Sequence, residues 1–370
     1  MQRRVTRTIS VGRVGIGSKF PVSIQSMTNT KTSDITATLN QINELSSIGC
    51  EIIRIAVPDI QSANAVNSIV SNSPIPVIAD IHFDYKLALL SIKNGINGIR
   101  INPGNIGSAD KVKAVAEAAG SAGISIRVGA NSGSIAKDYK PKSKNDGLQS
   151  KQETLSDSLV ESALYQCSLL EEYGFKNIKV SLKASDVLTM IKAYRKFAKK
   201  TDYPLHLGVT EAGTLFQSTI KSSVGIGALL ADGIGDTIRV SVTGDCRDEI
   251  KIAHSILESL SLRHAAPEII SCPTCARTST DLIKLANKIE SAISELKASG
   301  IEFNPFKLAI MGCAVNGPGE ARDADIGIAG ATGQYVLFEK EKTIAAYKEN
   351  EIIDVLLKYI IKKYGNSKNK

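Results

Sequence analysis

Between residues 22 and about 260, short apolar segments alternate with amphipathic helical patterns, and this alternation limits the possible folds more than any other feature. The apolar segments have the length and β-branched content of buried strands, and they lie at 22–27, 51–57, 76–80, 98–102, 125–129, 177–182, 205–210 and 237–242. Several intervening helical segments end at glycine, namely Gly49, Gly95 and Gly174. Eight strand–helix units in about 240 residues predict a TIM (β/α)8 barrel. A doubly wound sheet is the alternative, but no Gly-x-Gly-x-x-Gly follows the first strand.

The sequence changes character after the barrel pattern. A helical segment at 281–298, a strand-like KLAIMGC, a Gly/Pro turn and a closing helix, NEIIDVLLKYIIKKYG, predict a small α+β domain. We therefore expect a barrel domain at 1–262 and a second domain at 263–370. A unit of about 100 residues gains stability from a bound metal.

Net charge and the lack of targeting signals bear on the cellular location of the protein and on its binding partners. The N-terminus lacks the apolar stretch of a signal peptide, and no run of about 18 apolar residues predicts a membrane span, so we expect a cytoplasmic chain with no membrane partner. The net charge is +8. Because the lysines are scattered, this charge is a weak indication of nucleic-acid binding. It also suits an anionic substrate or an acidic protein partner, and charge alone does not decide between them.

Residues 132–156 interrupt the regular alternation. They are polar and poor in large apolar side chains, and they follow the fifth strand. The segment is interpreted as a long, mobile loop at the barrel mouth; an idle surface insertion is the alternative.

An arginine flanked by isoleucine or valine recurs in four strands: IIRIA, GIRIN, SIRVG and TIRVS. A buried charge costs several kcal/mol unless it is paired. In a TIM barrel the working residues follow the carboxyl ends of the strands. Those positions hold Arg54, Asp80, His82, Arg100, Asn102, Arg127, Asn131, Lys183, Thr210, Glu211, Arg239 and Ser241.

Any one of these arginines could belong to a structural ion pair. Four of them together with Lys183 outnumber the obvious acids in the ring, Asp80 and Glu211. The guanidinium fork matches phosphate oxygens two at a time. The barrel is therefore predicted to bind a small compound with several negatively charged phosphate oxygens.

The six cysteines fall into two groups. Cys50, Cys167 and Cys246 are isolated and are interpreted as core or bystander residues. Cys272 and Cys275 form a Cys-x-x-Cys pair, and Cys313 follows on a Gly-Cys turn. Three cysteines in this arrangement predict a metal site, since thiolates select zinc or iron–sulfur clusters.

The fourth ligand of this site would be an oxygen donor. The turn Gly317–Gly319 could bring Glu320 to the metal, although Glu320 could also be a surface acid. Three strong ligands with one displaceable oxygen describe a cluster with one open iron, which is a catalytic arrangement.

Eight motifs resemble the 4-hydroxy-3-methylbut-2-enyl diphosphate synthase family of the non-mevalonate isoprenoid pathway. In chain order they read VSIQSMTNTKTSD, ADIHF, RINPGN, KVSLKASD, LHLGVTEAG, GIGDTIRVS, SCPTC and GCAVNGPGE. The resemblance extends from about residue 4 to residue 365. The loop 132–156 is longer and more basic than this family leads us to expect, and Ala276 stands where a glycine is common.

The resemblance implies a TIM barrel followed by an iron–sulfur domain related to that of sulfite and nitrite reductases. It implies one [4Fe–4S] cluster per chain on Cys272, Cys275, Cys313 and Glu320. The implied substrate is 2-C-methyl-D-erythritol 2,4-cyclodiphosphate, whose ring is opened by two electrons from flavodoxin or ferredoxin. Glu211 is the expected proton donor near the reacting carbon, and His82 is expected to share this role or to orient the substrate.

Two other functions remain compatible with parts of the sequence. A zinc-stabilised nucleic-acid binder would use the same CPTC motif and positive charge. A barrel enzyme for another phosphate ester could carry a cluster for electron transfer alone, but such a cluster gains nothing from a displaceable Glu320.

Barrel topology also bears on the oligomeric state. The last barrel helix returns the chain to the end opposite the mouth, so the second domain starts there. If fully extended, the linker 261–271 could still return the second domain to the mouth of its own barrel. A head-to-tail homodimer, in which each second domain covers the partner's barrel, avoids such an extended connection and would complete both sites. The resemblance implies the same arrangement.

Overall fold

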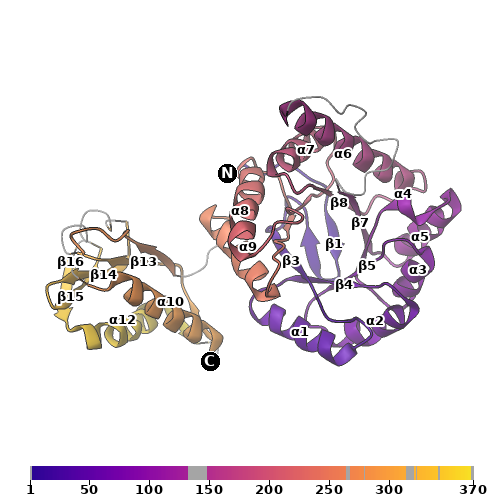
Figure 1. The fold of residues 1–370 in the computed structure, drawn as a ribbon. Helices are drawn as coiled ribbons and strands as arrows, with labels where there is room; N and C mark the ends of the chain where they lie inside the picture. Colours follow the sequence, from indigo (N-terminus) through magenta and orange to yellow (C-terminus); the bar gives the residue numbers. More distant parts are fainter. Residues whose placement is uncertain are drawn as a thin grey trace. The chain divides into compact units, whose positions relative to one another are not determined.

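A computed structural model of the chain describes residues 2–131, 148–263, 267–278, 280–313, 321, 323–340 and 342–367. The chain divides into two compact units, Met1–Arg263 and His264–Lys370 (Figure 1). In the described part of the chain, no helix combines the length and apolar character that a membrane span requires.

The first unit is built on an eight-stranded parallel sheet. Its strands are β3 (Ser23–Met27), β4 (Ile52–Ala56), β5 (Val77–Asp80), β6 (Gly98–Ile101), β7 (Ser125–Asn131), β8 (Ile178–Lys183), β9 (His206–Leu207) and β10 (Thr237–Ile238). Neighbours follow the chain from β3 to β8, and β10 joins β9 to β3. A parallel bridge between Val180 and Leu205 connects β8 to the segment before β9, so the sheet curls into the predicted TIM barrel.

Helices surround the strands (Figure 1). They are α1 (Ile35–Ser47), α2 (Ile60–Asn72), α3 (Tyr85–Lys93), α4 (Pro103–Ile106), α5 (Ala109–Ser121), α6 (Leu148–Glu171), α7 (Val187–Lys200), α8 (Leu215–Ala231) and α9 (Cys246–Ser259). At the start of α1, α2, α3, α7 and α9, an aspartate side chain accepts a hydrogen bond from a backbone N–H of the first turn. Gly49, Gly95 and Gly174 have positive φ just after helices, so the predicted glycine stops are confirmed.

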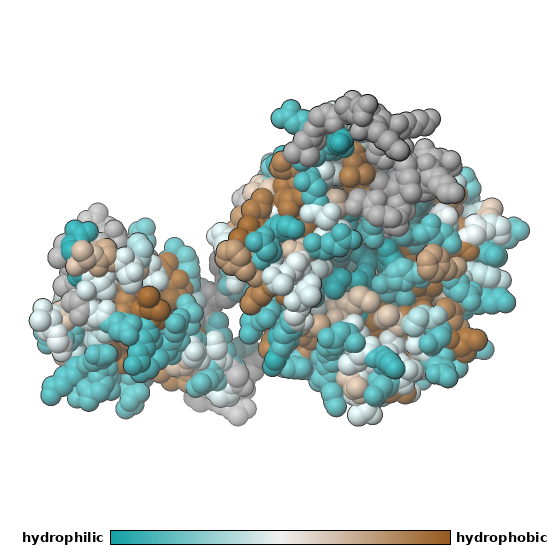
Figure 2. All heavy atoms as spheres, in the orientation of Figure 1, coloured by the Kyte–Doolittle hydropathy of each residue, from teal (hydrophilic) through white to brown (hydrophobic). Residues whose placement is uncertain are grey.

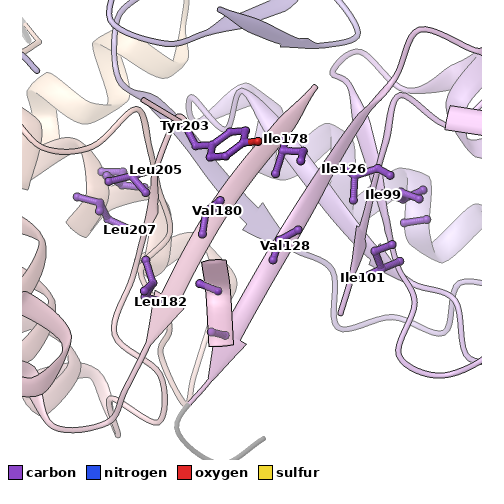
Figure 3. Packing of buried hydrophobic residues seen from close by; sticks show 14 of the residues in the cluster. Ile99, Ile101, Ile126, Val128, Ile178, Val180, Leu182, Tyr203, Leu205 and Leu207 are labelled. Atoms are coloured by element: carbon purple, nitrogen blue, oxygen red, sulfur yellow. The ribbon is translucent and has the colours of Figure 1, made fainter. Parts of the chain in front are cut away.

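Side chains on each strand alternate between the helices and the barrel interior. Figure 3 shows the apolar residues of β6, β7 and β8, among them Ile99, Ile126 and Val180, which belong to one buried cluster with the helices. The residues between them, such as Arg100 and Arg127, point into the barrel and are also buried. The alternation therefore gives the barrel an apolar outer layer and a polar interior.

An N-terminal hairpin closes the end of the barrel opposite the mouth. Strands β1 (Ile9–Val11) and β2 (Val14–Ile16) pack on Ile52 and Ile78, at the amino ends of β4 and β5. The chain leaves the unit at this same end. Arg263 donates to the carbonyl oxygen of Val22 (3.0 Å) and to the carboxylate of Glu51 (2.7 Å), which precede β3 and β4.

The prediction of a loop over 132–156 is wrong for its last part, because residues 148–156 form the first turns of α6. Residues 132–147 lie outside the described part of the chain. The helix was missed because its buried face is partly polar: Gln152, Ser156 and Ser158 are all buried. A hydrophobic period cannot reveal a helix that buries hydroxyl and amide groups.

The second unit contains a five-stranded mixed sheet in the order β11-β13-β14-β15-β16. The strands are β11 (Glu268–Ser271), β13 (Lys307–Met311), β14 (Ile326–Ala331), β15 (Gln334–Glu339) and β16 (Lys342–Tyr347). The first three are parallel, and the last two pair antiparallel. A separate pair joins β12 (Ile301–Phe303) to β17 (Gly365–Ser367).

Helices α10 (Leu282–Ala298) and α12 (Glu349–Tyr364) share one core with this sheet. Leu285 and Ile289 of α10 and Leu356 of α12 pack with Leu308 and Ile328 of the strands. The small α+β domain predicted from the sequence is therefore present.

Polar groups also occupy the barrel interior well below its mouth. Lys179, His206 and Gln25 are at most 1% exposed. Within the described residues, no hydrogen-bond partner reaches Lys179 Nζ, either ring nitrogen of His206, or either amide atom of Gln25. Burial, reinforced by Arg127 and Arg54 and opposed by Asp236, lowers the pKa of Lys179 to about 7.

This lysine should make stability depend on pH. The unfolded lysine holds its proton up to about pH 10.5, whereas the folded one loses it near pH 7. The free-energy cost that Lys179 imposes on folding is therefore complete below about pH 7 and disappears as the pH rises towards 10. Lys179→Met should be more stable than the parent at pH 7, by at least about 1 kcal/mol, and this advantage should shrink by pH 10 in urea titrations.

Lys199→Met on the exposed face of α7 is the matched control and should show no such pH-dependent difference. Parallel stability curves for the parent and Lys179→Met would mean that Lys179 is not held uncharged in the fold.

Candidate active site

Cationic side chains gather in the upper barrel, at positions that the strand registers bring together. Arg100 lies opposite Asp80 of β5 on one side and Arg127 of β7 on the other. Arg127 in turn lies opposite Lys179 of β8, and Asn131 lies opposite Lys183. These side chains form a cationic ring, which we define as Arg54, Arg100, Arg127, Lys183 and Arg239. All except Arg239, whose side chain is 17% exposed, are at most 7% exposed.

Asp80 is the central counter-charge of the cationic ring. Its carboxylate lies 3.2 Å from Arg100 Nη1 and 3.6 Å from Arg54 Nε. Burial alone would raise the pKa of Asp80, but Arg54 and Arg100 together lower it to about 2. Asp80 is therefore ionised at neutral pH and orients two guanidinium groups.

The second counter-charge is Glu249 of α9, which the sequence analysis missed. Its Oε1 lies 3.6 Å from Arg239 Nη2, and its Oε2 accepts a hydrogen bond from Ser26 Oγ at 2.7 Å. Glu211, the acid expected in this place, is exposed at the barrel mouth. The burial of Glu249 and its contact with Arg239 depend on how α9 packs on the barrel, so the local sequence contains no signal for this residue.

Two members of the ring are only weakly compensated. Arg127 donates one long hydrogen bond, of 3.4 Å, to Ser181 Oγ, and its Nε has no partner among the described residues. Burial, reinforced by Arg54 and Arg100, lowers the pKa of Arg127 well below its ordinary value. Burial together with Arg127 and Arg239 has the same effect on the pKa of Lys183.

Two glycines make room for these side chains, and the sequence analysis did not single them out. A Cβ on Gly208 would lie 2.6 Å from the Arg239 carbonyl oxygen and 3.2 Å from Lys183 Nζ. A Cβ on Gly129 would lie 3.3 Å from both Arg100 Nη2 and the Asn102 side chain. Glycine inside a strand is the sequence signal for such close approach.

The remaining predicted residues follow the carboxyl ends of the strands. Asn102 donates to the carbonyl oxygen of Gly129 at 2.6 Å in the amide orientation that satisfies both of its groups. His82 is exposed after β5, beside Phe83. Thr210 and Ser241 are partly buried after β9 and β10.

Glu211 has a backbone conformation that is uncommon for its residue type. Its φ is +54°, in the left-handed region that favours glycine. Such strain is held by the surrounding structure and clusters at functional sites. The conformation is consistent with a functional role for this carboxylate.

The cysteines of the second unit lie at the carboxyl end of its parallel strands. Cys272 follows β11, and Gly312 and Cys313 follow β13, its parallel neighbour. The Gly312 N–H donates to Cys272 Sγ at 3.2 Å. Hydrogen bonds from the backbone and side chain of Arg277 lower the pKa of the Cys275 thiol. Both contacts favour thiolates.

The surroundings of Cys272 are apolar. Cys272 packs against a buried cluster that contains Ala309, Ala324 and Ala329 together with the larger Met311 and Phe338. Within the described residues, the three cysteines do not converge into a group of three metal ligands. Glu320, the predicted fourth ligand, lies outside the described part of the chain. The hydrogen-bond donors at Cys272 and Cys275 fit thiolate ligands of an iron–sulfur cluster.

Comparison with known proteins covers both units. The GcpE TIM-barrel domain matches residues 6–254, and the GcpE protein C-terminal domain matches residues 268–362. Proteins named 4-hydroxy-3-methylbut-2-en-1-yl diphosphate synthase (flavodoxin) are similar along nearly the whole chain. The one from Clostridium acetobutylicum is 50% identical over 97% of this chain and 99% of its own length.

Two further relatives with the same name agree. The protein from Clostridium perfringens is 51% identical over 97% of this chain and 99% of its own length. The protein from Fusobacterium nucleatum is 50% identical over 99% of both chains. With both domains matched in order and half of all positions identical over the full length, this chain belongs to the GcpE family.

Proposed function

We propose that this chain is an oxidoreductase that opens the ring of 2-C-methyl-D-erythritol 2,4-cyclodiphosphate and forms 4-hydroxy-3-methylbut-2-enyl diphosphate, a step of isoprenoid precursor biosynthesis. The names of relatives that are half identical over the full length support this activity. The reaction consumes two electrons and one proton. It breaks the carbon–oxygen bond that closes the ring and removes one hydroxyl group as water.

The observation that carries the proposal is the charge imbalance inside the barrel. Five buried or largely buried cations of the ring are held against two carboxylates, Asp80 and Glu249, within the described residues. An apolar or neutral ligand would leave the excess positive charge uncompensated. A cyclic diphosphate supplies the missing negative oxygens at the spacing that guanidinium forks recognise.

The ring also suits the chemistry. Breaking the carbon–oxygen bond leaves an additional negative oxygen on the diphosphate, so positive charge fixed beforehand stabilises the transition state more than the substrate. Arg127 and Lys183 have the fewest compensating contacts and are the expected diphosphate ligands. Asn102, Asn131, Thr210 and Ser241 are expected to bind the remaining polar groups of the substrate.

The loss of a hydroxyl group requires a proton at the barrel mouth. Glu211 is the proposed donor, because its carboxylate is exposed at the mouth on a strained backbone. His82 follows the strand that carries Asp80 and is proposed to share this proton or to orient the substrate.

A [4Fe–4S] cluster held by Cys272, Cys275, Cys313 and Glu320 would supply the electrons one at a time when bound. The donors near Cys272 and Cys275 support the thiolate ligands, and Glu320 is proposed from the family resemblance alone. Flavodoxin is the proposed electron donor, since the relatives' names contain it; ferredoxin is the alternative. We propose a cytoplasmic protein that binds neither nucleic acid nor membrane.

We further propose a homodimer with sites shared between chains. Arg263 fixes the end of the first unit at the amino ends of β3 and β4, opposite the mouth. A second unit that starts there covers a neighbouring chain's mouth more directly than its own, which favours a head-to-tail pair.

Arg127→Met tests the substrate site. The parent protein, assayed without oxygen and with reduced flavodoxin, should convert the cyclic diphosphate. The KM of the variant should be raised by at least about tenfold, because the substrate loses one hydrogen bond to a charged group. Without substrate, the variant should be as stable as the parent or more so, because it loses an uncompensated charge.

Arg195→Met on the outside of α7 is the control for the loss of a positive charge, and its KM should match the parent's. A marked fall in the melting temperature of ligand-free Arg127→Met would show that Arg127 serves a structural ion pair instead.

The cluster ligands can be tested without turnover. Protein purified without oxygen should be brown, and Cys272→Ser or Cys313→Ser should lose most of the iron. Glu320→Ala should keep a more labile cluster with a changed spin-resonance spectrum. Cys246→Ser in the barrel should retain the parent's iron content. A colourless parent that contains zinc would contradict the cluster.

Shared sites can be tested by coexpression of two inactive variants, Glu211→Ala and Cys272→Ser. A mixed dimer would contain one intact barrel and one intact cluster in the same site, so random pairing should restore about a quarter of the parent activity. If isolated mixed dimers stay inactive, each chain completes its own site.

A further inference from the structure

Glu249 is a buried carboxylate that reaches the cationic ring from a helix outside the barrel strands. It lies in the first turn of α9 and is 4% exposed, and its Oε1 is 3.6 Å from Arg239 Nη2. Burying a carboxylate is costly unless hydrogen bonds and a counter-charge compensate the lost hydration. The contacts of Glu249 therefore indicate what the fold gains from an acid at this position.

Hydrogen bonds fix both carboxylate oxygens of Glu249. Oε2 accepts a hydrogen bond from Ser26 Oγ at 2.7 Å, and Oε1 accepts one from the backbone N–H of Val242 at 3.2 Å. Ser26 belongs to β3, and Val242 follows β10. Because both donors belong to the barrel wall, the orientation of the carboxylate does not depend on Arg239.

These hydrogen bonds lie where the barrel closes. The ladder between β3 and β10 ends at the pair Ile24 and Ile238. β3 continues to Met27, whereas Arg239 lies beyond the end of β10. Glu249 therefore connects the two sides of the closure at a level where the ladder between the described strands has ended.

Arg239, in contrast, has few contacts of its own. Its side chain is 17% exposed, the largest exposed fraction in the cationic ring, and its Nε has no hydrogen-bond partner among the described residues. Figure 2 shows hydrophilic residues over the middle of the barrel, inside the ring of helices labelled in Figure 1. A long side chain in polar surroundings has several rotamers available, and the fixed carboxylate favours the one that faces it.

We propose that Glu249 is a positioning residue, whose carboxylate, fixed by Ser26 and Val242, holds the Arg239 guanidinium in the direction required to bind a diphosphate oxygen. This inference rests on the proposed function and deepens it, because it gives a residue outside the barrel strands a role in substrate binding.

A positioning residue and a simple counter-charge affect binding in opposite directions. A carboxylate that only offsets positive charge weakens the attraction between the ring and an anion, so its removal strengthens binding. A carboxylate that orients a guanidinium lowers the conformational cost of binding, so its removal weakens binding. The sign of the change in affinity therefore distinguishes the two roles.

Two substitutions separate the charge of Glu249 from its reach. Glu249→Gln keeps the length of the side chain and groups that can bond to Ser26 and Val242, but it loses the ionic attraction to Arg239. Glu249→Asp keeps the charge and is one methylene shorter. Positioning predicts weaker binding in both variants. A simple counter-charge predicts tighter binding in Glu249→Gln and nearly unchanged binding in Glu249→Asp.

The test measures the binding of inorganic diphosphate by calorimetry, with full-length protein purified without oxygen and kept without a reductant. The Kd of Glu249→Gln and that of Glu249→Asp should each rise at least about fivefold. In an Arg239→Met background, Glu249→Gln should change the Kd less than about twofold, because the group that it positions is absent.

Asp248→Asn is the matched control, since it removes a charge from the same turn of α9 but from an acid that pairs with Lys251. Its Kd should equal the parent's. Ser26→Ala is a milder substitution for the case that Glu249 variants do not fold. It frees Oε2 without changing any charge, so positioning predicts a raised Kd, and a simple counter-charge predicts the parent's Kd.

Three results would overturn the positioning role. The first is tighter binding of diphosphate by Glu249→Gln. The second is an equal rise of the Kd with and without Arg239, which would make Glu249 a structural link between β3 and β10 only. The third is a parent protein that does not bind diphosphate, whatever its activity on the cyclic substrate.

This test is independent of turnover. An effect of Glu249 on diphosphate binding that requires Arg239 establishes the positioning role even if the protein does not convert the cyclic diphosphate. Conversely, an active enzyme whose affinity for diphosphate is unchanged in Glu249→Gln contradicts the positioning role alone.

Discussion

The mutual repulsion of cations inside the barrel is the interaction on which the rest of the first unit depends. Arg54, Arg100 and Arg127 occupy neighbouring strands with one carboxylate, Asp80, between the first two. Removing several like charges from water costs several kcal/mol for each ion. The apolar layer between strands and helices must offset this cost, and its isoleucine and valine side chains are almost fully buried. The fold therefore holds these side chains in place before any ligand arrives, which is the preorganisation on which electrostatic catalysis depends.

Much of this arrangement could be predicted because strands alternate with period two. An arginine between two β-branched apolar residues leaves one orientation that buries the apolar side chains against helices, and the strands at 98–102 and 125–129 adopt it. The same alternation, followed backwards from Lys183, reaches Lys179, so the deep lysine could also have been found. Local pattern fails where distant elements meet: Glu249 reaches Arg239 from α9, and the polar inner face of α6 conceals a helix.

The basic composition acquires a more specific meaning from the fold. The net charge of +8 suggests a basic surface, yet the cationic ring and Lys179 lie inside the barrel. The cations of the ring and Lys179 therefore face the barrel interior and contribute little to the positive charge of the solvent-facing surface. Helix α8 is the opposite case, an outer helix with one charged residue in 17. Total charge therefore describes neither the barrel interior nor this helix.

An anion in the cationic ring is stabilised more strongly when water is excluded, because the effective dielectric constant falls. Arg263 fixes the end of the first unit at the amino ends of β3 and β4, opposite the mouth. A second unit contributed by a neighbouring chain, as proposed for the homodimer, would exclude water from the mouth. The excess positive charge of the barrel interior would then act on the substrate at its full strength.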